Sequence, residues 1–533
     1  MGRCLIFCVV VALWGSAEAL VDSDASLSSA ITGAVDGAVI HLRAGRYRAP
    51  IVLEKEIHLV GDGEVRIDPS EPLPAKWGPA PEIGAGVWKS SLEQKPYELM
   101  VDGKIVAALR EDRVQTEGDW HWKTLLAKGP PRSGFTQIRA LWLWREAEKT
   151  AYVTLGGADP SGRTWSWMPT GAPALHFKGA RGATVRGLAF AGAFEAVRFD
   201  SGARGCVLRD CTLASFSHHG IILDGGAHSN LIVSNAIQRG SYESWVPAAT
   251  NKEEIKREYE VWQIHKLCGY FDRMGITLQA AGAGNRILSN FIRETFDGIN
   301  VTVHVVETLA KPLIGDGEGR DTEIAWNTVE DVRDSGIEIG GGAINLHVHD
   351  NVFRRTHGGF RFKLPRIGPV YIHHNLLEDD RGFNFWFSMD ASTASGYIYQ
   401  NTIVGHREAL VLHTLAPGGS PGIGIPRWHF LNNLIVTDRG YFTDQSKGAI
   451  PVNFTSRNNV VVGGRPPWKE GEGNERDCRY VDGVKLGPYF APDPASAAIG
   501  AGLVLSRYLD GKPLPGCEMG TFTGAAPSAG ARP

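Results

Sequence analysis

An asparagine followed by a short aliphatic stretch recurs along the central part of the chain, between Asp210 and Val461. Where no insertion intervenes, the spacing is 24 to 26 residues, which lies in the range of solenoid repeats. A turn then leads to a glycine and a segment of alternating apolar and polar residues, which is typical of a short strand. The repeats start at Asp210, Asn235, Asn290, Asn327, Asn351, Asn375, Asn401, Asn433 and Asn459.

Most repeats contain three short β-rich stretches and no helical stretch. This pattern predicts an all-β fold, a right-handed parallel β-helix of about ten or more coils. We expect each asparagine to occupy a tight bend in the left-handed conformation, and its amide to bond the equivalent amide one coil away.

The order of the segments predicts five parts. Residues 1–19 read as a signal peptide, because Arg3 precedes an apolar run and Ala17-Glu18-Ala19 fits a cleavage site. Residues 20–73 form an N-terminal cap and the first coils, with a short amphipathic helix over residues 26–35. Residues 74–170, with eight of the fifteen tryptophans, form an inserted β-rich subdomain. Residues 171–463 form the main β-helix, and residues 464–533 form a Pro/Gly-rich segment and tail.

Composition narrows the classes of partner. A net charge of −3 gives no field that would attract nucleic acid or an anionic membrane. No later apolar run is long enough to span a bilayer. Together with the predicted signal peptide, this predicts a secreted or periplasmic protein, and we expect it to be a monomer. We expect Cys206 and Cys211 to pack inside the coil, and Cys478 with Cys517 is an alternative disulfide.

Strand alternation indicates which side chains leave the coil. In Gly336-Ile-Glu-Ile both isoleucines point inward and Glu338 points outward. Aligning the strands on their glycines predicts two outward columns, and the preceding turns supply further polar groups. The first column holds Ile222, Thr277, Asn300, Glu338, Arg361, Asn384 and Val411; the second holds Asp224, Gln279, Thr302, Gly340, Lys363, Trp386 and His413; the turns hold His218, His219, Arg273, Asp297, Asp334 and His357.

Acids, bases, amides and a tryptophan on one strip are typical of a sugar-binding groove, although a solvated face with incidental ion pairs is the alternative. Glycoside hydrolysis needs two carboxyl groups about 5–9.5 Å apart, and neighbouring coils stack about 4.8 Å apart. Asp297, Asp334 and Glu338 satisfy this spacing and are the candidate catalytic residues.

Several neighbouring residues are candidates for substrate binding. Arg361 and Lys363 could grip an anionic sugar, Asn384 could bond hydroxyl groups, and Trp386 could stack on a sugar ring. The complete set is Arg361, Lys363, Asn300, His304, Asn384, Trp386, Asp224 and His219.

The sequence predicts neither a metal centre nor a cofactor. Calcium at Asp316-Gly-Glu-Gly-Arg-Asp321 is an alternative, because these residues offer oxygen ligands without EF-hand spacing. His347, His349, His373 and His374 lie away from the groove strand, and we interpret them as surface residues.

Short strings in the insertion carry a family resemblance. Gly86-Val-Trp-Lys, Glu98-Leu-Met-Val-Asp-Gly-Lys104, Arg110, Ala151-Tyr-Val-Thr-Leu and Asp159-Pro are similar to glycoside hydrolase family 141-like proteins. The coils resemble secreted right-handed parallel β-helix proteins that act on polysaccharides. Polysaccharide lyase family 6 shares the coil, but its Ser-x-Lys is absent after Glu338.

The resemblance implies a carbohydrate-active enzyme. A glycoside hydrolase with paired carboxylates is the leading hypothesis. The alternative is a lyase or C5-epimerase on a uronic-acid polymer, in which Arg361 neutralises the uronate and Lys363 or His304 takes the C5 proton. A third hypothesis is a glycan-binding protein without catalytic activity.

Overall fold

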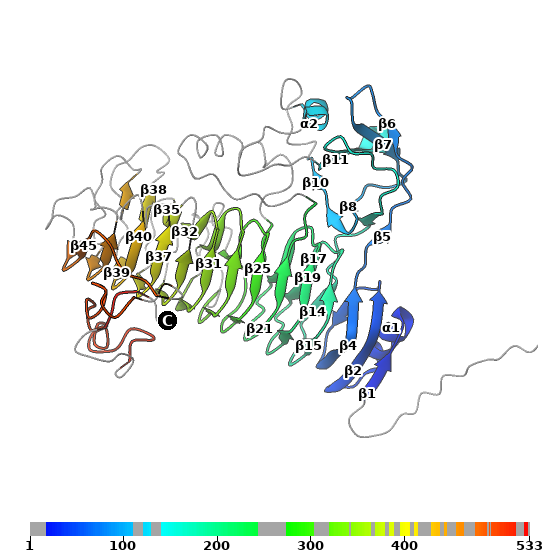
Figure 1. Cartoon of the computed structure of the whole chain (residues 1–533). Coiled ribbons are helices and arrows are strands. Elements are labelled where there is room, and N and C mark those ends of the chain that lie inside the picture. The colour runs from blue at the N-terminus through cyan, green and yellow to red at the C-terminus, as the bar shows by residue number, and fades with distance from the viewer. Residues whose placement is uncertain are drawn as a thin grey trace, which may run out of the picture.

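The computed structural model shows an elongated right-handed parallel β-helix that carries a smaller β-rich part near its N-terminal end (Figure 1). The structure describes residues 18–109, 121–128, 140–242, 273–302, 319–340, 343–363, 368–378, 383–388, 395–405, 410–413, 428–437, 442–444, 455–462, 475–487, 490, 492–518 and 527–530. The predicted fold class is confirmed.

Each complete coil contributes two strands to a bent sheet, which we call sheet A, and one strand to a second sheet, sheet B. All pairs of neighbouring strands whose register the structure gives in these two sheets are parallel. Sheet B contains β3 (Ile51–Leu53), β14 (Leu175–Lys178), β17 (Glu195–Asp200), β20 (His219–Leu223), β23 (Ile276–Gln279), β26 (Ile299–Thr302), β29 (Ser335–Ile339), β32 (Gly358–Lys363), β35 (Phe383–Ser388), β38 (Leu410–His413) and β41 (Phe442–Asp444).

Sheet A has 25 described strands. They are β1 (Glu18–Val21), β2 (Ala38–Tyr47), β4 (Ile57–Ile67), β15 (Thr184–Arg186), β16 (Ala189–Phe190), β18 (Val207–Arg209), β19 (Thr212–Ala214), β21 (Leu231–Val233), β22 (Ala236–Gln238), β24 (Arg286–Leu288), β25 (Phe291–Arg293), β27 (Glu323–Ala325), β28 (Thr328–Glu330), β30 (Leu346–His349), β31 (Val352–Arg354), β33 (Val370–His373), β34 (Leu376–Glu378), β36 (Gly396–Tyr399), β37 (Thr402–Gly405), β39 (Trp428–Leu431), β40 (Leu434–Thr437), β42 (Thr455–Arg457), β43 (Val460–Val462), β44 (Glu475–Arg476) and β45 (Arg479–Val481).

The asparagine repeat forms the predicted ladder of amides inside the coil. The Oδ1 of Asn351 accepts hydrogen bonds from the backbone N–H and the Nδ2 of Asn327, both at 2.9 Å. Its own Nδ2 donates to Oδ1 of Asn375 at 3.0 Å. The same contacts continue from Asn235 to Asn459, so the buried amides hold successive coils in register.

Two details of the ladder differ from the prediction. The left-handed conformation falls on the residue before each asparagine, as at Asp350 with a φ of 53°. Asp210 therefore occupies the bend, and Cys211 takes the ladder position, where its N–H donates to Oδ1 of Asn235 at 3.1 Å. The asparagine itself must keep its side chain in the coil interior to reach the next amide.

A second, shorter ladder at another corner was not predicted. The backbone N–H of Cys206 donates to Oδ1 of Asn230 at 3.0 Å, and the N–H of Asn230 donates to Oδ1 of Asn285 at 3.1 Å. Both Cys206 and Cys211 are buried in the coil, as predicted. The alternative disulfide is absent, because Cys478 and Cys517 are free thiols.

The glycine that opens several sheet B strands is required by close packing. A Cβ added to Gly298 would lie 2.6 Å from the carbonyl oxygen of Gly336 and 2.4 Å from Cγ1 of Val329. Gly220, Gly275 and Gly336 meet equivalent obstacles in the next coil. The glycines thus form a column where the backbones of successive coils come too close together for any side chain.

The open N-terminal end of the coil is covered by the predicted helix. This helix, α1 (Asp24–Gly33), begins slightly earlier than expected, because Ser23 is its N-cap and forms a capping box with Ser26. Leu27 points into the main core and is buried.

Residues 71–168 contribute two smaller sheets. One contains β6 (Gly78–Pro79), β7 (Val87–Ser91), β10 (Ala107–Ala108), β11 (Ala140–Arg145) and β12 (Thr150–Leu155); the other contains β5 (Glu71–Pro72), β8 (Glu98–Val101), β9 (Lys104–Ile105) and β13 (Trp165–Met168). Helix α2 (Trp122–Lys128) and a 3₁₀ turn (Glu146–Glu148) complete this part.

Part of the C-terminal segment packs on the outer face of sheet A. Leu505, Leu514 and Cys517 form a hydrophobic cluster with Tyr371 and Tyr399. The hydroxyl of Tyr399 donates to the carbonyl oxygen of Pro515 at 2.7 Å, which ties the segment to the coil.

Replacing Asn351 by alanine should lower the free energy of unfolding by about 1–3 kcal/mol, because it leaves buried partners on two neighbouring coils without hydrogen bonds. Chemical denaturation measures this loss. Unchanged stability would show that the ladder does not hold the coils together.

Gly298→Ala should also destabilise the protein, by at least about 1 kcal/mol, because the new methyl group collides with a backbone oxygen and a packed valine. Gly483→Ala is the matched control, since no atom lies within 4 Å of a Cβ added there. Equal melting temperatures for the two variants would contradict the close-packing explanation.

Candidate functional site

Three carboxylates converge on two neighbouring central strands of sheet B, β26 and β29. Asp297 precedes β26, Asp334 precedes β29, and Glu338 lies within β29. One oxygen from each carboxylate lies within 4.8 Å of those of the other two. The residues are 2%, 4% and 4% exposed, respectively, so the group is buried. We call these three residues the carboxylate cluster.

The register of the coils explains the convergence. Asn300 of β26 lies opposite Glu338 of β29, and Glu338 lies opposite Arg361 of β32. Asp297 reaches across the same step, because its Oδ1 accepts a hydrogen bond from the N–H of Ser335 at 2.9 Å. Acids from two adjacent coils therefore meet without any long-range loop.

One guanidinium and one amide contact the cluster. The Nη1 of Arg361 lies 3.0 Å from Oδ2 of Asp334 and 3.9 Å from Oε2 of Glu338. The Nδ2 of Asn300 donates to Oε1 of Glu338 at 3.3 Å. The carboxylate of Glu338 therefore has one amide donor and one guanidinium beside it.

The column prediction was wrong at β35. Trp386, not Asn384, lies opposite Arg361, and Ser388, not Trp386, lies opposite Lys363. The sequence Phe383-Asn-Phe-Trp-Phe allows two registers with phenylalanines inside the coil. The structure uses the later one, in which Phe360 stacks on Phe385 and Phe362 on Phe387.

This register gives Arg361 a different environment from the expected cationic patch. Its guanidinium centre lies 4.6 Å from the centre of the Trp386 ring, and it bonds Asp334 on the other side. An anionic sugar would have to compete with that carboxylate. The side chain of Lys363 and the whole of His304 lie outside the described residues, so their roles stay predictions.

A polar track leads from the cluster toward the N-terminal coils. The Nδ1 of His219 lies 3.1 Å from Oγ1 of Thr277, and Thr277 lies opposite Asn300. Asp224 lies at the far end of β20, where its carboxylate accepts a hydrogen bond from Arg198 at 2.6 Å. The substrate-binding roles of His219 and Asp224 stay predictions.

A second cluster of titratable residues surrounds His219, and its acid, Glu195, was not predicted. Glu195, His218 and His219 lie within 4.8 Å of one another, and Nη1 of Arg198 lies 3.1 Å from both oxygens of Glu195. Burial lowers the pKa of His218 to about 3, with Arg273 and Arg239 adding to the effect. Glu195 begins a strand without an asparagine repeat, so no sequence pattern marked it.

The inserted part contacts the coil next to these residues. The carboxylate of Glu98 accepts hydrogen bonds from Trp142 at 2.9 Å and from Ser217 of the coil at 2.8 Å. Burial raises the pKa of Glu98. Phe296, which directly precedes Asp297, packs in the hydrophobic cluster of the insertion with Trp122 and Leu125. The insertion therefore contacts the residue next to a candidate catalytic acid.

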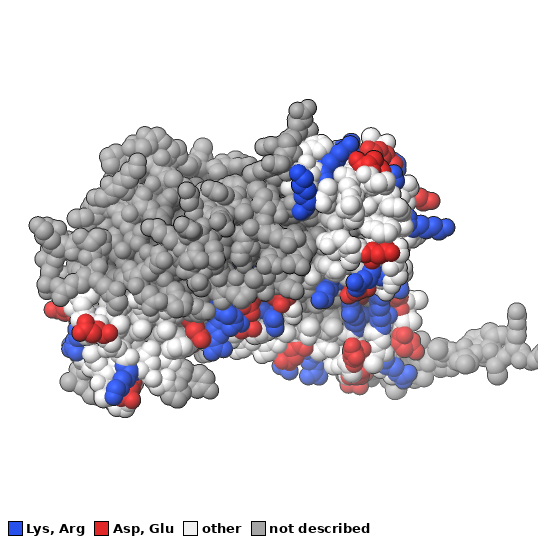
Figure 2. Space-filling model, turned by 45° about the horizontal axis from the view of Figure 1, so that its top comes forward, with Lys and Arg blue, Asp and Glu red and all other residues white. Residues whose placement is uncertain are grey.

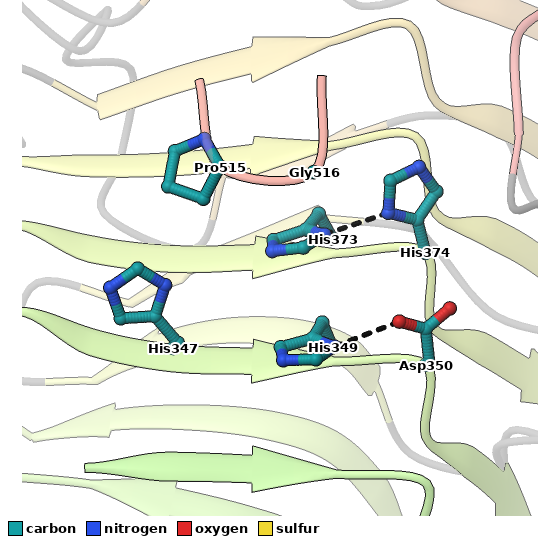
Figure 3. Close-up of a pocket in the computed structure, with 7 residues that line it drawn as sticks. All are labelled: His347, His349, Asp350, His373, His374, Pro515 and Gly516. Carbon is teal, nitrogen blue, oxygen red and sulfur yellow. Dashed lines mark hydrogen bonds and ion pairs between the residues drawn. The ribbon is translucent and has the colours of Figure 1, made fainter. Parts of the chain in front are cut away.

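We had expected the histidines in β30, in β33 and directly after β33 to be surface residues, and this prediction was wrong for two of them. His373 and His374 are buried, and with His347, His349, Asp350, Pro515 and Gly516 they line a pocket of about 190 Å³ (Figure 3). The prediction failed because the alternation of the strand did not show that the C-terminal segment covers this face.

Other sequence expectations fall on undescribed residues. Residues 1–17 of the predicted signal peptide, Asp316 to Glu318 and residues 243–272 lie outside the described residues. Asp321 is described, and it accepts a hydrogen bond from Asn345 at 2.7 Å.

On the face shown in Figure 2, basic and acidic residues of the described surface are interspersed, which agrees with the near-neutral net charge. Among the described residues, no helix is both long enough and apolar enough to cross a membrane.

Comparisons with known proteins give no family assignment. No protein-family model and no curated protein matches the chain. Solved structures that are similar to this chain include three with TM-scores below 0.5. They are XylC in complex with xylose (12% identity, TM-score 0.47, 87% of this chain and 86% of that one), a family 6 polysaccharide lyase from Pseudopedobacter saltans (11%, 0.45, 95% and 100%) and the catalytic unit of a GH87 alpha-1,3-glucanase from Streptomyces thermodiastaticus (13%, 0.44, 92% and 72%). Likenesses this distant assign no activity to this chain, and the similarity to glycoside hydrolase family 141 stays a prediction.

The environment of His218 makes stability depend on pH. Its pKa in the folded protein, about 3, is below its ordinary value of 6.5, so the unfolded chain binds a proton that the folded chain refuses. The stability conferred by neutral His218 is complete above pH 6.5 and is lost as the pH falls from 6.5 toward 3. Each pH unit in this window costs up to about 1.4 kcal/mol.

His218→Phe should flatten this dependence, because phenylalanine keeps the stacking on Phe194 and cannot be protonated. Unfolding curves at several pH values test it. His228→Asn, whose native imidazole bonds the neighbouring Ser229 at the surface, is the control for removing a histidine and should keep the wild-type slope. An unchanged slope in His218→Phe would show that other groups dominate.

Proposed function

We propose that this protein is a secreted carbohydrate-active enzyme that cleaves glycosidic bonds, acting as a glycoside hydrolase through the carboxylate cluster. The observation that supports the proposal most is the burial of three carboxylates within 4.8 Å of one another on sheet B. A folded protein gains little from burying repelling acids, so such a group points to chemistry.

The separation of the carboxylates suits one stereochemical class. Retaining glycosidases hold their two carboxyl groups about 5–5.5 Å apart, whereas inverting enzymes need about 6.5–9.5 Å to admit a water molecule. One oxygen of each carboxylate lies within 4.8 Å of one oxygen of the other two, a spacing that is compatible with the shorter, retaining arrangement. We therefore propose a double displacement through a covalent glycosyl-enzyme intermediate.

Glu338 suits the role of nucleophile. Asn300 and Arg361 contact its carboxylate and would orient it for attack on the anomeric carbon. Asp297 or Asp334 would then donate a proton to the leaving oxygen and later take one from water. Trp386, whose ring lies under the Arg361 guanidinium, adds an aromatic surface beside the acids.

A lyase on a uronic-acid polymer is the second candidate, and a cation would support it. The cluster offers three carboxylates, and Oδ1 of the buried Asn300 has no hydrogen-bond partner within the described structure. Such oxygen ligands suit calcium, which would neutralise a uronate. The proton acceptor would be Lys363 or His304.

Glu338→Gln should reduce the catalytic rate by at least about 100-fold without changing the melting temperature, because the amide has the same shape but cannot attack or hold charge. Activity is measured on neutral and anionic polysaccharides by new reducing ends and by ultraviolet absorbance. Glu330→Gln, an acid of the same coil on sheet A, is the control. A Glu338→Gln enzyme within about tenfold of the wild type would exclude Glu338 from the mechanism.

The same assays separate the two candidates. A hydrolase produces reducing ends without ultraviolet absorbance and keeps its rate in a calcium chelator. In Glu338→Ala, whose smaller side chain leaves room for azide, it regains turnover when azide replaces the missing nucleophile. Unsaturated products and a loss of rate in the chelator would support the lyase instead.

A further inference from the structure

Trp326 occupies a backbone position that does not suit it. It lies at the bend before Asn327, in the left-handed conformation with a φ of 57°. Most of the coils place Ser, Asp, Asn, His or Gln at this bend. A bulky residue there is a conformational outlier, and such positions cost about 1–3 kcal/mol.

Packing does not explain the tryptophan. Its side chain is 52% exposed, whereas most large apolar residues of the described coils are buried. The contact that the structure gives its ring is an edge-on approach to His349, with ring centres 5.4 Å apart. Neither its backbone conformation nor its packing accounts for the indole, and its flat ring is open to a ligand.

His349 connects the indole to the pocket of Figure 3. On its other side the imidazole stacks on His373 with ring centres 5.0 Å apart, and both histidines line the pocket. In Figure 3, His349 bonds Asp350 and His373 bonds His374, at 2.8 Å and 2.7 Å. Imidazole nitrogens and a carboxylate thus line a small hollow next to a flat apolar surface.

The chemistry of this surface indicates its ligand. An exposed indole binds the C–H face of a sugar ring, and polar side chains bond its hydroxyl groups. The pocket, about 190 Å³, is smaller than the about 300–1,000 Å³ of typical ligand pockets, which suits one sugar unit. Asp350, in the pocket, would repel a uronate, whereas Glu323 beside His349 is paired with Arg286 at 2.7 Å. A neutral glycan is therefore favoured.

This surface is separate from the carboxylate cluster. Trp326 lies between β27 and β28 and the pocket lies on β30 and β33, all strands of sheet A, whereas Asn300 and Glu338 lie on sheet B. A glycan bound here would not occupy the candidate active site. The surface could hold a polymer while another part of the same chain is cleaved.

We propose that Trp326 and the pocket lined by His349, Asp350, His373 and His374 form a second, non-catalytic binding site for a neutral glycan. The proposal shares with the proposed function only the premise that this protein acts on glycans. Its function would be to raise the local concentration of polymer, as a second binding module does.

Trp326→Asn is the direct test, because asparagine occupies the same bend before two other coils, at Asn432 and Asn458. Affinity electrophoresis in gels containing xylan, β-glucan, galactomannan, pectate or alginate measures binding to polymer. The variant should lose at least about tenfold in affinity for one of the neutral polymers, and its melting temperature should stay the same or rise. Asp350→Asn should weaken binding to the same polymer.

Phe291→Ala, which removes another partly exposed aromatic from sheet A, is the control and should bind as the wild type does. All proteins carry Glu338→Gln, so that cleavage does not disturb binding. Wild-type affinity in Trp326→Asn, a lower melting temperature in that variant, or no binding of the parent to any neutral polymer would overturn the proposal. Trp326-dependent binding, combined with no turnover of any glycan by the protein that retains Glu338, would instead refute the proposed hydrolase and leave this site standing.

Discussion

The hydrogen bond between one coil and the next is the interaction on which this structure depends. Parallel backbone pairing fixes the distance between coils, and the buried asparagine amides fix their register, because each amide accepts from one coil and donates to another. An amide buried without these partners would be costly, so the ladder also selects against a slipped register. The glycine column, where backbone oxygens block any Cβ, imposes the same register at the beginning of successive strands of sheet B.

The candidate site is a product of this regular stacking together with a few departures from it. Adjacent strands bring Asn300, Glu338 and Arg361 into one line without any special loop. The turns before these strands add Asp297 and Asp334, and the insertion packs against Phe296 beside them. The coil thus supplies the spacing of the acids, while the insertion contacts Phe296 next to Asp297.

The sequence predicted what depends on periodicity. The asparagine and glycine positions identified the coils, and alternation placed Glu338, Asn300 and Arg361 on the outside of neighbouring strands. Periodicity could not choose between two registers of Phe383-Asn-Phe-Trp-Phe, because both keep phenylalanines inside, and the choice depended on ring stacking. Nor could it show that His373 and His374 are buried, since that depends on a C-terminal segment more than a hundred residues away. Glu195 was not predicted, and the burial of His218 was not foreseen, because contacts with distant residues, not local pattern, define their environment.

The ladder separates distance in space from distance along the chain. Asn235 and Asn290 are 55 residues apart along the chain, and Asn327 and Asn351 only 24. Yet the hydrogen bonds between the side-chain amides of each pair measure 3.0 and 2.9 Å, respectively. A segment added at a turn therefore leaves the geometry of the coil unchanged. Segments inserted at the turns are free to diverge in length and chemistry while the acids keep their positions. Such a scaffold can exchange one substrate preference for another by replacing a loop, with no need to redesign its core.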